Sequence, residues 1–215
     1  MQISIPEHIN EIRLEQFLSF DKANKGDDTE FLMHKLINIF CGISMRDTLN
    51  ITLEDAESVA EDVTELLGQD TPFQKTFDYN GKTWGFIPNL ENITLGEFVD
   101  LDTYMRDTQD IHKAMSVLYR PITKQYKDLY SIEPYKGHRE YSEELKGMPL
   151  GVATAATLFF YRLGNELVAH SMGYFSRLKK GQNQTTQQKG NLRKNTAGLI
   201  AYTNLLKEML PDSSK

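Results

Sequence analysis

The hydrophobic pattern of this chain changes period once, between residues 73 and 87. Aromatic and polar residues alternate from Phe73 to Tyr79, and the alternation resumes from Trp84 to Phe86. Asn80-Gly81 lies between these runs and suits the two left-handed positions of a type I′ turn. The pattern predicts one small antiparallel β-hairpin over about 73–87.

Most of the remaining chain has helical periodicity. Thr94 and Glu97 form a capping-box pattern, which predicts a helix beginning at Leu95. We expect this helix to have one apolar face, formed by Leu95, Phe98, Val99 and Leu101. A further helix is expected to end at Arg120-Pro121, because a proline disfavours helical backbone in the residue before it. Residues 122–147 are less regular and indicate either an extended packed loop or an irregular hairpin.

Before the hairpin, the pattern indicates several shorter helices. Ser44 and Thr52 stand where N-caps are expected, and Gly42 and Gly68 stand where helices end. The helix after Thr52 carries six acids on its outer face, namely Glu54, Asp55, Glu57, Glu61, Asp62 and Glu65.

The C-terminal third of the chain predicts a long helix followed by a tether. An apolar pattern rich in Leu, Ala and Phe runs over about 149–178, a polar Gln-rich segment fills 179–190, and an amphipathic helix is expected within 191–215. The fold class expected is therefore mainly α (α+β). The expected organisation is a helical body over 1–178, a linker over 179–190 and a C-terminal helix over 191–215.

Composition places the chain among globular proteins of the reducing interior of a cell. The 215 residues are 40% hydrophobic and 25% charged, which is ordinary for a folded domain. Cys41 is the single cysteine and cannot form an internal disulfide. The first residues lack the pattern of a signal peptide. The uncharged run from Met148 to Tyr161 is shorter than the ~20 residues that a membrane span needs, so we interpret it as a buried core helix.

Charge is distributed unevenly along the sequence. Residues 171–215 contain eight Lys or Arg against two acids, and because the whole chain carries -6, the first 170 residues carry -12. An acidic body with a basic tail favours a protein partner or self-association over nucleic-acid binding.

Three carboxylates near the capping box are the strongest candidates for chemistry. Glu97 and Asp100 are spaced to share a helical face, with Asp102 nearby, and paired carboxylates can bind a hard metal or divide acid and base roles. Capping already accounts for Glu97, and the helix dipole stabilises acids in a first turn. We therefore favour a structural role for these acids.

Other constellations lack essential members. Glu166 and His170 have the i, i+4 spacing of a metal pair without the further ligands that zinc needs, so a hydrogen-bonded pair is favoured. His112 beside Asp110 is interpreted in the same way. The aromatic set Trp84, Phe86, Tyr104 and Tyr119 resembles a base-stacking platform, but its spacing favours core packing. The sequence predicts no catalytic residue, metal site, cofactor or nucleic-acid site.

The basic tail is the one segment for which a binding role is expected. Its basic residues could form a solvated linker or a partner-binding segment, and the apolar stripe after them favours partner binding. The predicted partner-binding residues are Arg177, Lys179, Lys180, Arg193, Lys194, Leu199, Ile200, Leu205 and Leu206. The docking site of the tail is expected on the same chain, on a second copy or on another protein. The candidate surface for its basic residues is the acidic face of 53–67.

Several sequence blocks resemble a family of proteins from tailed-bacteriophage genomes. The blocks are FDYNGKTWGFIPNLENITLGEFVDLDTY, HKAMSVLYRPI, YSIEPYKG and MPLGVATAATLFFYRLGNEL. The resemblance spans roughly Phe31 to Leu167 and implies a small morphogenesis protein. Tail assembly chaperones are the nearest described class, and other members are expected near the head–tail junction. No catalytic residues come with the family.

Two functions follow as expectations. The first is a non-enzymatic tail assembly chaperone that shields apolar segments of a tail component, such as the tape-measure protein, in the host bacterial cytoplasm. The alternative is a structural component of the virion, a head–tail connector or ring subunit, bound through its C-terminal helix and able to form a homo-oligomer. Membrane association is not expected.

Overall fold

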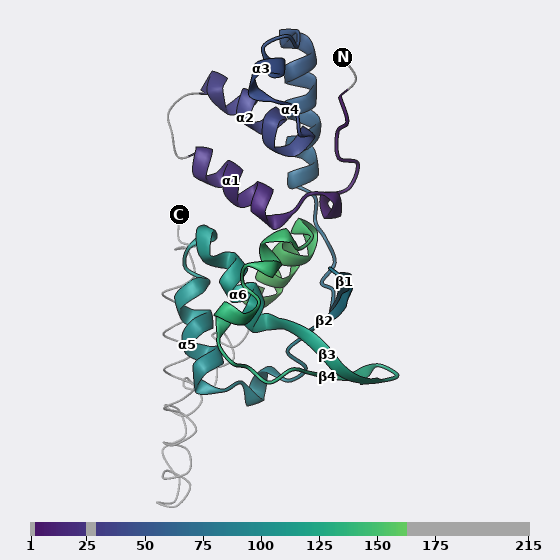
Figure 1. Cartoon of the computed structure of the whole chain (residues 1–215), viewed down its shortest axis with the longest axis vertical. Coiled ribbons are helices and arrows are strands. Elements are labelled where there is room, and N and C mark those ends of the chain that lie inside the picture. The colour runs from purple at the N-terminus through teal and green to yellow at the C-terminus, as the bar shows by residue number, and fades with distance from the viewer. Residues whose placement is uncertain (1–2, 25–28, 163–215) are drawn as a thin grey trace, which may run out of the picture. The chain divides into compact units, whose positions relative to one another are not determined.

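The computed structural model describes residues 3–24 and 29–162. The chain divides into two units, Met1–Ala156 and Thr157–Lys215, and only the first six residues of the second unit are described. The fold combines helices with one four-stranded antiparallel sheet, so the expected mixture of helix and sheet is confirmed (Figure 1).

Four α-helices precede the sheet: α1 (Leu14–Asn24), α2 (Thr29–Cys41), α3 (Met45–Thr48) and α4 (Leu53–Leu67). The predicted caps are confirmed, since Ser44 Oγ accepts from the Asp47 N–H and Thr52 Oγ1 from the Asp55 N–H, each at 3.2 Å. These bonds satisfy amides that a helix start would otherwise leave without partners.

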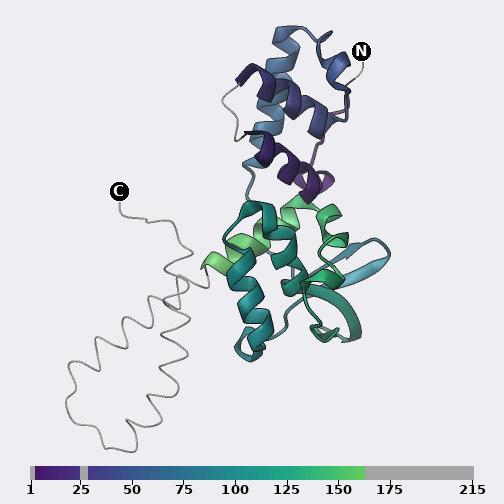
Figure 2. The same ribbon diagram turned by 60° about the vertical axis from the view of Figure 1, so that its left-hand side comes forward.

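The helices α1 and α4 both pack against α2 (Figure 2). Their shared core contains buried residues at helical spacing, namely Leu18, Leu36, Ile37, Phe40, Val59, Val63 and Leu66. Phe20 and Phe40 join α1 to α2 with ring centroids 5.4 Å apart. This interior provides a hydrophobic core that does not depend on the sheet.

The sheet is larger than the single hairpin that the sequence predicts. Its strands are β1 (Thr76–Tyr79), β2 (Lys82–Phe86), β3 (Tyr119–Tyr126) and β4 (Leu129–Ile132), in the order β1-β2-β3-β4 with antiparallel neighbours. Asn80 and Gly81 connect β1 to β2 with φ values of 52° and 72°. Residues 119–132 form the second hairpin, whose register shifts between Ile122 and Lys124.

Pro121 explains why the sequence pattern hides β3. A proline usually argues against a central strand because it cannot donate a ladder hydrogen bond. Here Pro121 lies opposite Trp84, and its carbonyl accepts from the Glu133 N–H at 3.0 Å. The helix α6 (Ile111–Leu118) ends directly before Tyr119, so the chain passes from helix to strand without a loop.

The aromatic core is built on β2. Trp84 is fully buried, stacks on Phe77 with centroids 6.3 Å apart and meets Tyr141 edge-on at 5.2 Å. Its indole N–H donates to the Tyr79 carbonyl at 3.1 Å. Phe86 and Tyr119 are buried beside it. The interpretation as core is therefore confirmed for Trp84, Phe86 and Tyr119. Tyr104, the fourth member of the set, is only half-buried.

The helix α5 (Leu95–Tyr104) packs against α6. The single turns η2 (Leu90–Asn92) and η3 (Thr108–Asp110) lie in the loops before α5 and α6, and η4 (His138–Glu140) and η5 (Glu144–Gly147) follow the sheet. The capping box at Thr94 is confirmed.

The predicted apolar face of α5 is wrong for two of its four residues, Leu95 and Val99. Leu101 is 2% exposed, whereas Leu95 is 79% exposed and Val99 49% exposed. At 100° per residue, Leu95 and Val99 lie on the side of the helix opposite Glu97.

The predicted long helix runs from 150 to 162 within the described part of the chain. Its first turns are buried at Leu150, Val152 and Ala153. The N-terminal segment pairs with its start, since the Leu14 N–H donates to Met148 O at 2.9 Å and the Leu150 N–H to Ile12 O at 2.8 Å. No helix among the described residues is long and apolar enough to cross a membrane.

Candidate functional site

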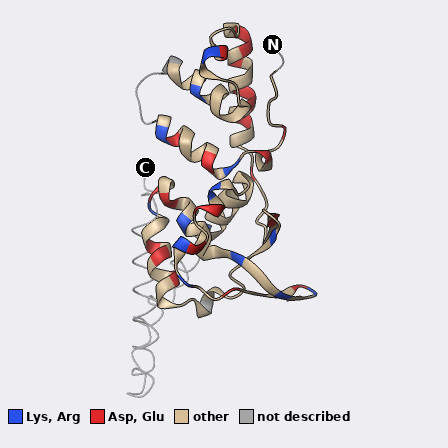
Figure 3. Cartoon of the chain, in the orientation of Figure 1, with Lys and Arg blue, Asp and Glu red and all other residues tan. Residues whose placement is uncertain are grey.

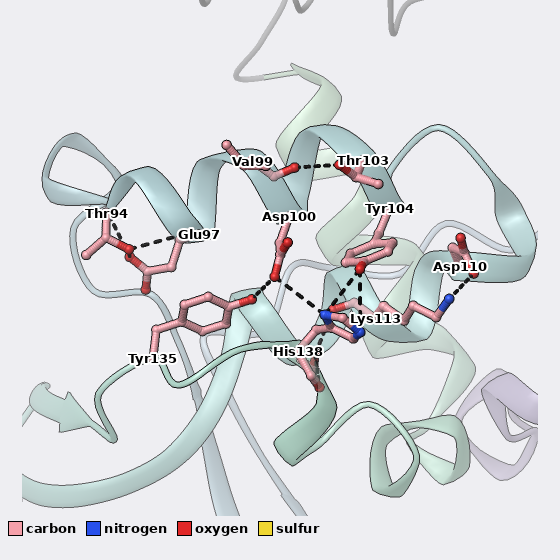
Figure 4. Close-up of polar contacts among 11 residues, drawn as sticks. Thr94, Glu97, Val99, Asp100, Thr103, Tyr104, Asp110, Lys113, Tyr135 and His138 are labelled. Carbon is pink, nitrogen blue, oxygen red and sulfur yellow. Dashed lines mark hydrogen bonds and ion pairs between the residues drawn. The ribbon is translucent and has the colours of Figure 1, made fainter.

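The candidate site is built on α5, which buries the charged Glu97 beside Leu101 on its inner side and exposes Leu95 and Val99 on its outer side. The Thr94 N–H donates to Glu97 Oε2 at 2.6 Å, and the Glu97 N–H donates to Thr94 Oγ1 at 3.3 Å (Figure 4). This reciprocal pair fixes the start of the helix and holds the Glu97 side chain in one rotamer.

The second oxygen of Glu97 forms a buried ion pair with β3. Arg120 Nη2 lies 2.6 Å from Glu97 Oε1, and both side chains are less than a tenth exposed. Arg120 also places its guanidinium 5.5 Å from the centroid of the Tyr135 ring. Its Nε and Nη1 atoms are buried without a hydrogen-bond partner among the described residues. Glu97 is therefore the carboxylate that compensates the buried charge of Arg120.

Hydrogen bonding, rather than burial, decides the charge state of Glu97. Burial alone would raise the pKa of this carboxyl group. The hydrogen bonds from Thr94 and the Arg120 guanidinium oppose that effect, and the net result is a pKa below the ordinary value. Glu97 is thus ionised at neutral pH and already has its partners.

One turn further along α5, Asp100 joins a second polar cluster. Its Oδ2 accepts a short hydrogen bond from the Tyr135 hydroxyl and lies 3.5 Å from His138 Nδ1. The Tyr104 hydroxyl lies 3.2 Å from the same His138 nitrogen. Burial and the hydrogen bond to Asp100 raise the pKa of Tyr135, so its hydroxyl stays protonated and donating at neutral pH.

Lys113 of α6 also contacts the inner side of α5. Lys113 Nζ lies 2.7 Å from Asp110 Oδ1 and 5.1 Å from the centroid of the Tyr104 ring. The hydrogen bond to Asp110 raises the pKa of Lys113. The polar groups of α5 are therefore tied to α6, to β3 and to the segment after β4.

The structure assigns structural roles to the three carboxylates that the sequence nominates. Glu97 caps α5 and neutralises Arg120, Asp100 accepts from Tyr135, and Asp102 pairs with Arg106 at 2.6 Å. Within residues 3–24 and 29–162, no group of three or more His, Cys, Asp or Glu side chains could hold a metal ion. The cluster holds α5 in place.

The other nominated pairs have different outcomes. His112 is buried on α6, where burial lowers its pKa, and Asp110 pairs with Lys113. Glu166 and His170 lie outside the described residues. The predicted binding residues of the tail also lie outside them, namely Arg177, Lys179, Lys180, Arg193, Lys194, Leu199, Ile200, Leu205 and Leu206.

The outer side of α5 is the candidate interaction surface. Leu95 and Val99 are one helical turn apart and exposed, while the opposite side of the helix buries the charged Glu97. Leu101 follows the usual amphipathic order, in which apolar side chains face the core, whereas Leu95 and Val99 depart from it. The sequence contains the signal, because the Glu97 of a capping box must face the N-cap and so places Leu95 and Val99 on the other side.

At two further places, large apolar side chains are exposed in pairs. Tyr126 and Leu129 face each other at the tip of the β3–β4 hairpin and are 72% and 75% exposed. Leu49 and Leu53, around the start of α4, are 72% and 69% exposed. Apolar side chains grouped on a surface indicate contacts with other molecules.

Comparisons with protein-family models, curated proteins and solved structures find no match to this chain.

Proposed function

We propose that this chain is a non-enzymatic assembly protein of a tailed bacteriophage, a tail assembly chaperone that covers an apolar helical segment of a tail component such as the tape-measure protein. The observation that carries the proposal is helix α5, which exposes Leu95 and Val99 while it buries the Glu97–Arg120 ion pair. The sequence resemblance to phage morphogenesis proteins supplies the class of partner.

The exposed pair suits a helical partner. Side chains at i and i+4 form one stripe on a helix, and such stripes pack against the apolar side of a second amphipathic helix. Burying one such leucine is worth about 2 kcal/mol. Covering Leu95 and Val99 would therefore favour a complex and would hide the apolar side of the partner at the same time.

The inner polar cluster supports this role by holding α5 rigid. Glu97, Asp100 and Tyr104 each contact a side chain from outside the helix, namely Arg120, Tyr135 and His138. A surface that is already ordered loses little conformational entropy on binding. The cost of presenting two apolar residues to water is therefore met by contacts on the other side of the helix.

The tail is proposed to extend this binding surface. In this proposal, residues 179–190 form a tether and the amphipathic helix within 191–215 docks on the partner, using the basic and apolar residues named above. A tether raises the effective concentration of the second contact.

Co-expression with the tape-measure protein of the same phage tests the proposal. We expect the wild-type chain to raise the solubility of the tape-measure protein and to co-purify with it, and we expect the double variant L95S/V99S to lose both effects. Phe31→Ser is the control, since this side chain is 45% exposed, close to the 49% of Val99, but lies on α2 and in neither proposed contact. Independent migration of the two wild-type proteins in size-exclusion chromatography would refute the proposal.

The alternative function is a connector or ring subunit of the virion. The exposed apolar residues at the β3–β4 tip and near α4 favour it, because a ring subunit needs surfaces for its neighbours. Mass spectrometry of purified particles distinguishes the two functions. A chaperone is absent from particles, whereas a ring subunit is present in many copies.

A further inference from the structure

The hairpin of β3 and β4 extends beyond the rest of the sheet. Only Tyr119–Pro121 of β3 pair with β2, and from Ile122 onward β3 pairs with β4 alone (Figure 1). The exposed end of this hairpin, residues 122–132, is called the ribbon below. Such a two-stranded projection has little core of its own to stabilise its tip.

One face of the ribbon is fixed against the sheet. The Tyr130 hydroxyl donates to the Phe86 carbonyl at 2.8 Å. A Cβ atom at Gly85 would lie 2.6 Å from the Tyr130 ring, so this ring occupies the space that the glycine leaves open. The anchored Tyr130 defines the inner face of the ribbon.

The outer face of the ribbon carries apolar and basic side chains, with one acid, Asp128, in the turn beside them. Side chains alternate between the two faces of a strand, so Leu129 and Ser131 point away from the face of Tyr130. Tyr126 is the cross-strand partner of Leu129, and Lys124 is the partner of Ser131. Lys127 lies in the turn, with its Nζ 5.5 Å from the centroid of the Tyr126 ring. This outer face therefore presents a Tyr–Leu pair beside two lysines.

The region around α4 is apolar and acidic, which complements the apolar and basic side chains of the ribbon. Leu49 and Leu53 are exposed at its N-terminal end, and the helix carries six exposed acids and no basic residue (Figure 3). Leu53, Glu57 and Glu61 follow one another at four-residue spacing and so form a line along one side of the helix. Leu49, Leu53 and this line of acids are called the α4 surface below.

We propose that the ribbon of one copy of this chain docks on the α4 surface of a second copy. Tyr126 and Leu129 cover Leu49 and Leu53, and Lys124 and Lys127 face the carboxylates of Glu57 and Glu61. Each copy uses two different surfaces, so the contact is head to tail and leaves a ribbon and an α4 surface open at the two ends of a dimer. The proposal involves neither α5 nor the partner assigned to it.

The mass of the full-length chain tests the proposal. We expect light scattering after size-exclusion chromatography to show self-association that increases with protein concentration and weakens from 50 to 500 mM salt, because salt screens exposed charges. The variants Y126S/L129S and L49S/L53S should each weaken self-association by at least about tenfold, since each loses one half of the apolar contact. Circular dichroism checks that both variants remain folded.

Mixing these two variants is the decisive measurement. Y126S/L129S retains an intact α4 surface and L49S/L53S retains an intact ribbon, so the mixture should form a dimer with one copy of each. A charge exchange provides a second test of the pairing. K124E/K127E and E57K/E61K should each associate weakly alone and recover association when mixed.

Three results would overturn the proposal. These are a wild-type chain that stays monomeric at all concentrations in 50 mM salt, self-association that survives Y126S/L129S, and a mixture that forms no heterodimer. Self-association that survives Y126S/L129S but disappears on truncation after Lys180 would assign the contact to the tail instead. The double variant L95S/V99S should self-associate as the wild type does. The self-association proposal and the chaperone proposal can therefore fail independently of each other.

Discussion

Arg120 and Glu97 lie in different elements, yet their side chains form a buried ion pair with 2.6 Å between Nη2 and Oε1. The pair joins β3 to the first turn of α5. Removing one partner of such a pair leaves an uncompensated buried charge, which costs much more than the pair itself contributes. This asymmetry makes the pair a sensitive probe of how α5 is held.

We expect Glu97→Gln to lower the free energy of unfolding by about 3–5 kcal/mol, because Arg120 then stays charged and buried alone. The double variant E97Q/R120M should lose less than the sum of the two single variants, since it removes both charges. Urea unfolding measures all three. Asp102→Asn, in a partly exposed pair on the same helix, is the control and should cost less than about 1 kcal/mol. Additive losses at Glu97 and Arg120 would contradict this account.

The pKa of Glu97 predicts how this contribution depends on pH. Because the folded pKa lies below the unfolded value of about 4.3, ionisation of Glu97 stabilises the fold above that value. The contribution is lost as pH falls through the folded pKa. The difference in unfolding free energy between the wild type and Glu97→Gln should therefore shrink below about pH 4. A difference that stays constant between pH 7 and pH 3 would show that Glu97 does not titrate in this way.

Trp84→Ala should destabilise the first unit by about 3–5 kcal/mol, because the indole is fully buried between Phe77 and Tyr141. Trp84→Phe keeps most of the ring volume but loses the hydrogen bond to Tyr79, so it should cost less. Denaturant unfolding compares the two. A loss below about 1 kcal/mol for Trp84→Ala is typical of surface sites and would mean that the indole is not part of the core.

Truncation after Lys180 tests the proposed tail. We expect cooperative thermal unfolding to persist, because the described unit has its own buried core, and we expect binding to the tail component to weaken. Calorimetry and co-purification measure the two effects. A truncated chain that no longer unfolds cooperatively would place the segment after Lys180 in the core and would refute the linker.

Local signals account for what the sequence predicts well. Thr52 and Thr94 act within one turn of their helices, and Asn80-Gly81 acts within one turn of backbone, so a short window contains the necessary information. The Glu97–Arg120 pair joins residues far apart in sequence and has no local signature. Arg120 directly follows the buried residues Val117–Tyr119, and this position is the available clue that its charge needs a buried acid.

The errors also have physical causes. Leu95 and Val99 are apolar, so a pattern based on hydrophobicity places them inside, although the capping geometry of Glu97 turns them outward. Pro121 correctly marks the end of the preceding helix, but it also argues against a central strand, and the exposed side chains at the end of β3 lack a clear alternation of buried and exposed positions. In each case a tertiary contact decides the structure against the local pattern.

The pairing of the N-terminal segment with residues 148–150 also bears on when the chain can fold. Residues 9–14 leave the ribosome early, but the backbone groups that Ile12 and Leu14 bind belong to Leu150 and Met148. Ile9, Ile12 and Leu14, all buried in the finished structure, must wait for that late segment. Closing so long a loop is slow. During synthesis the first helices therefore emerge while Ile9, Ile12 and Leu14 are still without the segment that buries them. The unit is completed only after residue 150 has left the exit tunnel.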